Sequence, residues 1–197
     1  MLIRGRSGSG KTTLLNLLGG LDRPTSGTGT IDGNDLNGMN GRQRDLWRRE
    51  KVAYVFQALA LLPGLTALEN VELPLRIAGV EPRAASQRAR DQLEIVGLGP
   101  RTHHKVFELS GGEQQRVAIS RALVKKPAVL FADEPTGELD QKSGATVMQL
   151  LQSAVQERHM TAVVTSHDND VASYADMSYA MVDGRPQLVQ SLVEGAE

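Results

Sequence analysis

The feature that most constrains the fold is a glycine-rich segment near the start of the chain. It consists of Gly5, Arg6, Ser7, Gly8, Ser9, Gly10, Lys11 and Thr12, and it matches the pattern G-x-x-x-x-G-K-[ST] in full. Glycines let such a loop curl so that successive backbone N–H groups point at phosphate oxygens, and the following helix adds the positive end of its dipole. The lysine suits the β- and γ-phosphates, and the threonine hydroxyl suits Mg²⁺. The pattern therefore predicts a strand, a phosphate-binding loop and a helix in succession.

We assign Thr13, the next residue, to the same nucleotide-binding segment, which we call the phosphate loop (Gly5–Thr13). A flexible Gly/Ser turn would account for the glycines alone. However, a short apolar stretch, Met1–Ile3, precedes the loop, and leucines at helical spacing follow it. This context favours a binding site for a nucleoside triphosphate over a plain turn.

Further along the chain, apolar runs with the lengths of strands alternate with an amphipathic helix. Val129–Ala132 is entirely apolar and Thr161–Thr165 is nearly so, which is the pattern of strands covered on both faces. Between them, apolar residues recur at helical spacing: Val147, Leu150, Leu151, Ala154 and Val155. Asp183-Gly184 predicts a tight turn between two paired strands. The predicted fold class is therefore α/β, a P-loop NTPase core with a mainly parallel sheet.

The middle of the chain has a different character. Residues 69–126 carry Ala89, Leu93 and Val96 at helical spacing and offer no convincing strand. We interpret this region as a helical subdomain inserted into an α/β core, which residues 1–68 and 127–197 would form. No linker rich in Pro, Gly and Ser divides the chain, so residues 1–197 are expected to form a single domain.

Two acidic residues, Asp133 and Glu134, directly follow the Val129–Ala132 strand. In a parallel sheet, the carboxyl ends of the strands are where ligand chemistry takes place. Asp133 is expected to hold Mg²⁺, and Glu134 is expected to accept a proton from, or orient, the water that attacks the γ-phosphate. An acidic helix start would explain the pair in isolation. The apolar strand before the pair and the phosphate loop upstream favour catalysis.

Two further polar residues follow predicted strands at the same edge of the sheet. His167 comes after Thr161–Thr165, and its imidazole can hydrogen-bond a γ-phosphate oxygen. Gln57 follows the short strand Val52–Phe56, and its amide can ligate Mg²⁺ and contact the attacking water. The predicted catalytic residues are therefore Glu134, His167 and Gln57, and the predicted Mg²⁺ ligands are Thr12, Gln57 and Asp133.

A second glycine motif, which we call the signature segment, spans Leu109–Arg116 and reads LSGGEQQR. Ser110 suits a helix N-cap, and the two glycines after it expose backbone N–H groups at the start of a helix. Capping alone would explain Ser110 but would not require both glycines. The signature segment therefore predicts a second anion-binding helix start.

In their order along the chain, these motifs resemble the nucleotide-binding subunit of ABC transporters, and the resemblance covers essentially the whole chain. That subunit carries a phosphate loop, a glutamine, a Leu-Ser-Gly-Gly-Gln-like motif, an Asp-Glu pair and a histidine. Residues 131–140 (FADEPTGELD) and 61–71 (LLPGLTALENV) look most similar to the branch of lipoprotein-releasing and macrolide-export ATPases. The resemblance implies an ATPase that uses ATP and Mg²⁺ and drives export or extraction by a membrane partner.

The resemblance also implies two protein partners. Two copies of the chain would face each other head to tail, with each ATP between the phosphate loop of one copy and the signature segment of the other. A transmembrane permease would receive the motion through residues 57–63. The apolar run Ala58–Leu62 within them is either ordinary core or part of a groove for a cytoplasmic helix of the permease. The residues that would act in trans are Ser110, Gly111, Gly112, Glu113 and Asp140.

Composition argues against several other classes of function. The 22 Lys and Arg residues nearly balance the 23 Asp and Glu residues, and only 4% of residues are aromatic, so nucleic acid is not an expected partner. The absence of cysteine excludes thiolate metal sites and a thiol nucleophile. No apolar stretch approaches the roughly 20 residues of a membrane helix. We expect a cytoplasmic protein that is peripheral on the inner face of the cell membrane.

The chain departs from the family at its start. The resemblance implies about 35 to 40 residues before the phosphate loop, which would form antiparallel strands and carry an aromatic side chain that stacks on adenine. We therefore expect an N-terminally truncated chain whose N-terminal antiparallel β-subdomain is largely missing. Two alternatives stay open. One is an ABC-type ATPase that regulates a non-transport membrane complex, such as one for cell-wall hydrolysis, and the other is a truncated inactive fragment.

Overall fold

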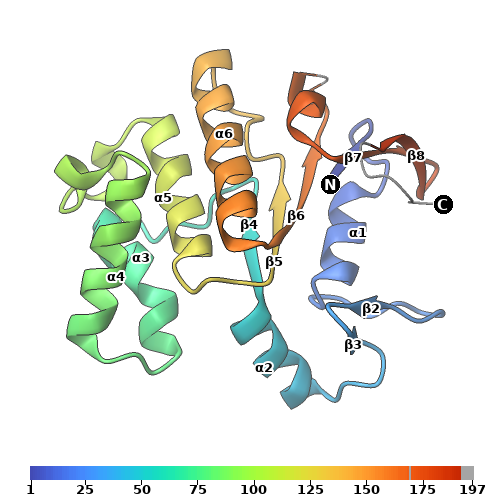
Figure 1. Ribbon diagram of the computed structural model, residues 1–197, viewed down its shortest axis with the longest axis horizontal. Coiled ribbons are helices and arrows are strands. Elements are labelled where there is room, and N and C mark those ends of the chain that lie inside the picture. The colour runs from blue at the N-terminus through green and yellow to red at the C-terminus, as the bar shows by residue number, and fades with distance from the viewer. Residues whose placement is uncertain (169, 192–197) are drawn as a thin grey trace.

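A six-stranded, mostly parallel sheet forms the centre of the fold (Figure 1). The structure is a computed structural model that describes residues 1–168 and 170–191. The strands of the sheet are β1 (Leu2–Arg4), β4 (Val52–Val55), β5 (Val129–Asp133), β6 (Thr161–Ser166), β7 (Met177–Val182) and β8 (Arg185–Ser191). Their order is β4-β5-β6-β1-β7-β8, and only β7 and β8 pair antiparallel. The predicted fold class is therefore confirmed.

The alternation of side chains along β5 explains why both faces of the sheet are covered. Leu130 and Ala132 pack on one face, and Val129 and Phe131 pack on the other, because consecutive residues of a strand point to opposite sides. All four side chains are buried. A strand with four consecutive apolar residues, as in Val129–Ala132, is expected to lie between two layers, and both layers here are helical.

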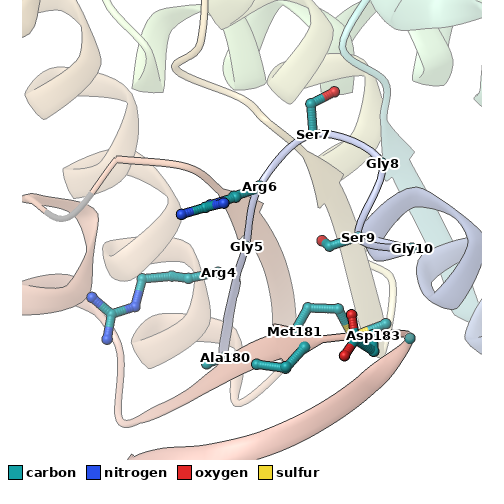
Figure 2. Close-up of a pocket in the computed structure, with 12 residues that line it drawn as sticks. Arg4, Gly5, Arg6, Ser7, Gly8, Ser9, Gly10, Ala180, Met181 and Asp183 are labelled. Atoms are coloured by element: carbon teal, nitrogen blue, oxygen red, sulfur yellow. The ribbon is translucent and has the colours of Figure 1, made fainter.

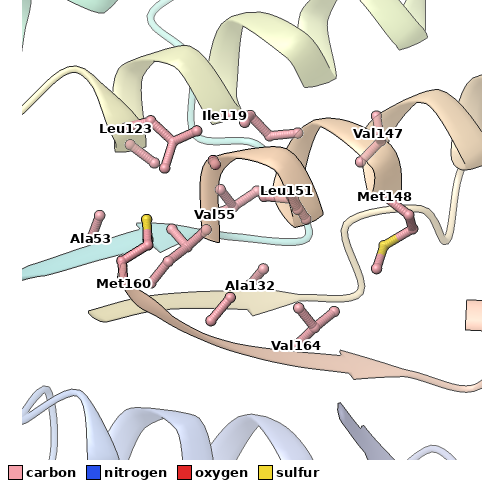
Figure 3. Close-up of a cluster of buried hydrophobic side chains, with 14 of the residues drawn as sticks. Ala53, Val55, Ile119, Leu123, Ala132, Val147, Met148, Leu151, Met160 and Val164 are labelled. Atoms are coloured by element: carbon pink, nitrogen blue, oxygen red, sulfur yellow. The ribbon is translucent and has the colours of Figure 1, made fainter. Parts of the chain in front are cut away.

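Two pairs of helices form these layers. On one face, α5 and α6 bring Ile119 and Leu151 onto β4, β5 and β6 (Figure 3). On the other face, α1 and α2 bring Leu15 and Trp47 into one cluster with Phe131. The helices of the described chain are α1 (Lys11–Leu18), α2 (Gly41–Lys51), α3 (Ala67–Ile77), α4 (Pro82–Ile95), α5 (Gly111–Leu123) and α6 (Gln141–Arg158).

Helices α3, α4 and α5 share a second apolar cluster beside the sheet, at the left of Figure 1. Ala89, Leu93 and Val96 are buried in it, as their helical spacing predicts. Helix α5 contributes to two clusters, because Val117 packs with α3 and α4 while Ile119 packs on the sheet. The signature segment at the start of α5 is therefore attached to both parts of the molecule.

Short elements complete the described chain. Strands β2 (Thr30–Ile31) and β3 (Asn34–Asp35) form a small antiparallel hairpin. Short 3₁₀-helices lie at η1 (Gly99–Arg101), η2 (Val106–Glu108) and η3 (Asp170–Tyr174). Asp183 and Gly184 join β7 to β8 with φ angles of 48° and 75°, as a two-residue hairpin turn requires. Among the residues described, no helix is both long enough and apolar enough to cross a bilayer.

Candidate functional site

The phosphate loop joins the end of β1 to the start of α1. Gly8 and Gly10 have φ angles of 77° and 99°, which residues with a side chain rarely adopt. Gly10 is the N-cap of α1 and provides no capping side chain, so the first N–H groups of the helix are available to an anion. Figure 2 shows the loop beside the end of β7, where Met181 and Asp183 line the same cleft of about 800 Å³.

Polar atoms along the loop are available to a ligand. The hydroxyl of Ser9 is buried and has no hydrogen-bond partner in the described part of the chain. Arg6, Ser7 and Thr13 are exposed to solvent. A buried hydroxyl is costly unless a ligand or water satisfies it. The loop therefore fits the phosphate group that its sequence predicts.

The ammonium group of Lys11 is enclosed by the loop, and the residue is only 6% exposed. Its Nζ donates to the carbonyl oxygens of Gly5, at 2.8 Å, and Arg6, at 3.2 Å. Lys11 Nζ also forms an ion pair with Glu134 Oε1 at 3.3 Å. An entering phosphate would compete with Glu134 for this cation, because both groups are anions that accept charge-assisted hydrogen bonds.

Thr12 and Asp133 bring two hard oxygen atoms together. Thr12 Oγ1 donates to Asp133 Oδ2 at 2.7 Å, across 121 residues of sequence. The other carboxylate oxygen of Asp133 accepts a hydrogen bond from Thr165 Oγ1 at 2.5 Å. Hydroxyl and carboxylate oxygens are ligands that Mg²⁺ prefers in proteins, so these residues fit the predicted ion.

The carboxylate of Glu134 connects several predicted residues. One of its oxygens pairs with Lys11, and the other is hydrogen-bonded to His167 Nδ1. The Glu134 side chain is 15% exposed, whereas that of His167 is 62% exposed and faces solvent. Gln57 lies just beyond β4, where it lines a small cavity of about 90 Å³ with Glu134 and Gly111. The structure thus joins Lys11, Glu134 and His167 by contact and leaves Gln57 on the wall of a neighbouring cavity.

The signature segment forms the first turn of α5. Ser110 is the N-cap: its Oγ accepts from the Glu113 N–H at 3.3 Å, and the Glu113 carboxylate accepts from the Ser110 N–H at 2.8 Å. Hydrogen bonds from the backbone and hydroxyl of Ser110 hold the pKa of Glu113 below its usual range. Arg101 adds an ion pair to Glu113 at 3.2 Å. These contacts fix the helix start on which the two glycines lie.

The start of α6 lies next to the signature segment. A Cβ atom at Gly112 would lie 3.3 Å from Ser143 Oγ, so the starts of α5 and α6 are in close contact there. Asp140 is the N-cap of α6 and accepts hydrogen bonds from the Ser143 N–H, at 3.0 Å, and from its hydroxyl, at 2.7 Å. These hydrogen bonds lower the pKa of Asp140. Two of the residues predicted to act in trans therefore lie near each other.

The apolar run Ala58–Leu62 is mostly exposed, which excludes the alternative that it is ordinary core. Only Leu61 packs against the cluster of α3, α4 and α5. Leu59 and Ala60 have left-handed backbone conformations, with φ angles of 54° and 50°, and these conformations turn the run outward. The guanidinium group of Arg121 donates to the carbonyl oxygens of Leu59, at 2.6 Å, and Ala60, at 2.5 Å. Arg121 on α5 therefore secures the loop that begins at Gln57.

Sequence reasoning missed Thr165 and Arg121, although both contact predicted site residues or their loop. A signal for Thr165 was present, because it is a polar residue in a strand that otherwise reads as buried. Arg121 carries no comparable signal, since an arginine in the last turn of a helix usually faces solvent and favours the helix dipole.

Comparisons with known proteins give one consistent family. The sequence model described as "ABC transporter" matches residues 1–137. The chain is 44% identical over 182 residues to the ABC transporter ATP-binding protein YtrE of Bacillus subtilis, which covers 92% of this chain and 79% of the relative. It is 47% identical over 182 residues to the lipoprotein-releasing system ATP-binding protein LolD of Hydrogenovibrio crunogenus, with the same coverage.

A solved structure is similar over nearly the whole chain. It is a dimeric structure of a post-hydrolysis state of the ATP-binding cassette MJ0796, bound to ADP and Pi. The TM-score is 0.86 at 41% sequence identity, and the match covers 96% of this chain and 85% of that one. The similarity therefore extends from the sequence motifs to the fold that carries them.

Proposed function

The chain belongs to the ABC transporter family of ATP-hydrolysing subunits, and we propose that two copies close head to tail around two ATP molecules to drive a transmembrane permease. The observation that carries this proposal is that the two helix starts predicted to bind anions line different cavities within one copy. The similar cassette of known structure is itself a dimer bound to ADP and Pi.

The two helix starts serve different clefts in a single copy. The cleft along the phosphate loop is lined by β1, the loop and the β7–β8 hairpin, and no described residue of the signature segment lines it. A second copy related by a two-fold axis would bring its own α5 start to the phosphates bound by Lys11. The residues that act across this interface are Ser110, Gly111, Gly112, Glu113 and Asp140.

Binding of the nucleotide rearranges the contacts of Lys11. Its Nζ exchanges Glu134 Oε1 for the phosphate oxygens of ATP, and this exchange releases the Glu134 carboxylate. Thr12, Asp133 and Gln57 would hold Mg²⁺, and the bound ion would neutralise charge on the phosphate oxygens. The uncapped start of α1 donates its free N–H groups to the same oxygens.

Hydrolysis then requires a base beside the γ-phosphate. Glu134 accepts a proton from water, the water oxygen bonds to the γ-phosphorus, and the bond to the bridging oxygen breaks to leave ADP and phosphate. His167 keeps the Glu134 carboxylate oriented through the hydrogen bond at Nδ1. Loss of the shared γ-phosphate removes contacts between the copies and lets them separate.

The test uses Glu134→Gln, which keeps the shape of the side chain and removes its basicity. We expect turnover to fall by about 100-fold or more, while ATP converts the protein from monomer to dimer in analytical ultracentrifugation. Glu157→Gln, on an exposed position of α6, is the matched control and should keep both turnover and the response to ATP. Turnover near the wild-type rate in Glu134→Gln, or no dimer at saturating ATP and Mg²⁺, would show the proposal to be wrong.

The permease contact is proposed at the exposed run Ala58–Leu62. Leu62 is 45% exposed, and the run adjoins Gln57, so movement there reaches the nucleotide site directly. A permease docked here would hold the chain at the cytoplasmic face of the membrane. The similarity to a LolD protein supports a permease that releases or exports its substrate, and lipoproteins are the first class to test.

Leu62→Asp tests the docking surface. We expect it to abolish co-purification with the proposed permease, the membrane protein recovered with the wild-type chain, while leaving the ATPase activity of the isolated protein unchanged. Val189→Asp, on β8, is the control, because Val189 is also an exposed apolar residue, at 55%. Equal recovery of the membrane protein with both variants would place the contact elsewhere.

A further inference from the structure

The hydroxyl of Thr165 joins the two carboxylate residues of the site. Its Oγ1 donates to Asp133 Oδ1 at 2.5 Å and accepts a hydrogen bond from the Glu134 N–H at 3.1 Å. The backbone carbonyl of Thr165 accepts from the same N–H at 3.2 Å. One side chain therefore contacts both the predicted Mg²⁺ ligand and the backbone of the predicted base.

The register of the sheet determines this position. Thr165 pairs with Asp133 of β5 on one side and with Ile3 of β1 on the other, so it lies between the strand that ends in the carboxylates and the strand that enters the phosphate loop. Thr165 is completely buried. A buried hydroxyl needs partners, and those of Thr165 are both supplied by the end of β5.

The contact with Asp133 orients its carboxylate. The Thr165 hydroxyl donates a hydrogen bond to Asp133 Oδ1. The other carboxylate oxygen, Oδ2, then points to Thr12 Oγ1, which lies 2.7 Å away. Without the Thr165 hydroxyl, the Asp133 carboxylate could rotate about its last torsion, which is broad for Asp. The pair of oxygen ligands would then no longer be held together before Mg²⁺ binds.

The contact with Glu134 holds an unusual backbone. Glu134 has a φ of 48°, in the left-handed region that residues with a side chain seldom occupy. This conformation persists where the surroundings over-determine it, and here the Glu134 N–H has two acceptors on Thr165. In this backbone conformation the Glu134 carboxylate contacts Lys11 and His167.

We infer that Thr165 is a positioning residue for ATP hydrolysis, which sets both the carboxylate of Asp133 for Mg²⁺ and the backbone of Glu134 for proton transfer. The inference rests on the proposed roles of Asp133 and Glu134. Thr165 is completely buried, and its hydroxyl hydrogen-bonds only Asp133 and Glu134 among the described residues, so it would act through them. Its effect should therefore appear in turnover and in the Mg²⁺ requirement, and should leave the Mg²⁺-independent part of nucleotide binding unchanged.

The test compares Thr165→Val, which replaces the hydroxyl by a methyl group, with Thr165→Ser, which keeps it. We expect Thr165→Val to lower kcat by about 10- to 100-fold and to raise the Mg²⁺ concentration needed for binding of a fluorescent ATP analogue by a similar factor. Binding of the analogue in EDTA should stay within about twofold. Thr165→Ser should restore both the kcat and the Mg²⁺ titration.

Thr102→Val is the matched control, because Thr102 is also buried and its hydroxyl donates to the Gly99 carbonyl at 2.6 Å, away from the site. It should lower the melting temperature without changing the Mg²⁺ requirement. If Thr165→Val melts well below this control, Thr165→Ala, which introduces no methyl contact with Asp133, replaces it in the same assays. A kcat and a Mg²⁺ titration within twofold of wild type in the folded variant would overturn the inference.

Asp133→Ala and Glu134→Gln, measured in parallel, distinguish a failure of the proposed catalytic site from a failure of the positioning role of Thr165. If both keep turnover, the proposed site is wrong, whatever Thr165→Val does. If both lose turnover and Thr165→Val does not, the proposed site stands and only the positioning role of Thr165 is refuted.

Discussion

Gly19 is the position where a single methyl group should disturb the phosphate-loop helix most directly. It lies at the C-cap of α1 with φ −81° and ψ 3°, a conformation open to any residue, so backbone strain does not require glycine there. A Cβ atom, however, would lie 1.2 Å from Tyr54 Oη and 2.2 Å from its Cζ. Gly19→Ala must therefore displace the ring of Tyr54.

The ring has little room to move. Tyr54 stacks on Phe56 and on Phe131, with ring centroids 5.3 Å apart in both pairs, and its hydroxyl donates to the Leu15 carbonyl at 3.2 Å. Overpacking of this kind costs about 1–3 kcal/mol, and the lost hydrogen bond costs about 1 kcal/mol. We expect Gly19→Ala to lower the free energy of unfolding by about 2–4 kcal/mol.

A double-mutant cycle isolates the clash. In a Tyr54→Val background the obstructing atoms are absent, so Gly19→Ala should be neutral or stabilise by up to about 1 kcal/mol through the unfolded chain. Urea unfolding, with the slope of free energy against urea unchanged, measures each corner of the cycle. Gly64→Ala is the control, because no atom lies within 4 Å of a Cβ there. An equal loss from Gly19→Ala in both backgrounds would refute the reasoning.

Three further outcomes follow from single side chains. Arg121→Ala should lower the free energy of unfolding by about 2 kcal/mol, because the carbonyls of Leu59 and Ala60 lose a charged donor, and limited proteolysis should then cut that loop faster. Lys11→Ala should abolish ATP binding in a fluorescence titration, whereas a Lys125→Met control should bind normally. Burial lowers the pKa of Lys125 to about 8, so between pH 8 and 10 the unfolded chain binds more protons and stability should rise with pH. Lys125→Met should lack this rise when urea midpoints of the two proteins are compared at each pH.

The fold was largely predictable because apolar periodicity reports burial directly. Val129–Ala132 reads as a strand covered on both faces, and its side chains do divide between two helical layers. The order of the motifs along the chain places the phosphate loop and the Asp-Glu pair at the carboxyl edge of one sheet, and Thr12 and Asp133 meet there.

The finer contacts depend on information that periodicity does not contain. The role of Thr165 follows from strand register, which aligns it with Asp133 rather than with a neighbour one residue away. The exposure of Ala58–Leu62 follows from left-handed conformations at Leu59 and Ala60, which neither residue type favours intrinsically. The ion pair between Lys11 and Glu134 depends on the side-chain torsions of both residues, which the order of residues does not determine.

Because helix α5 belongs to two apolar clusters, it couples the stability of the two parts of the molecule. Val117 contributes to the cluster with α3 and α4, and Ile119 contributes to the core above the sheet, so neither cluster can be lost without exposing apolar surface of the other. Two cores that share a helix stabilise each other. Unfolding either one alone costs the free energy of its own contacts and of the contacts that the shared helix makes with the other core. We expect one cooperative melting transition, with amide protection in α5 reaching the global value.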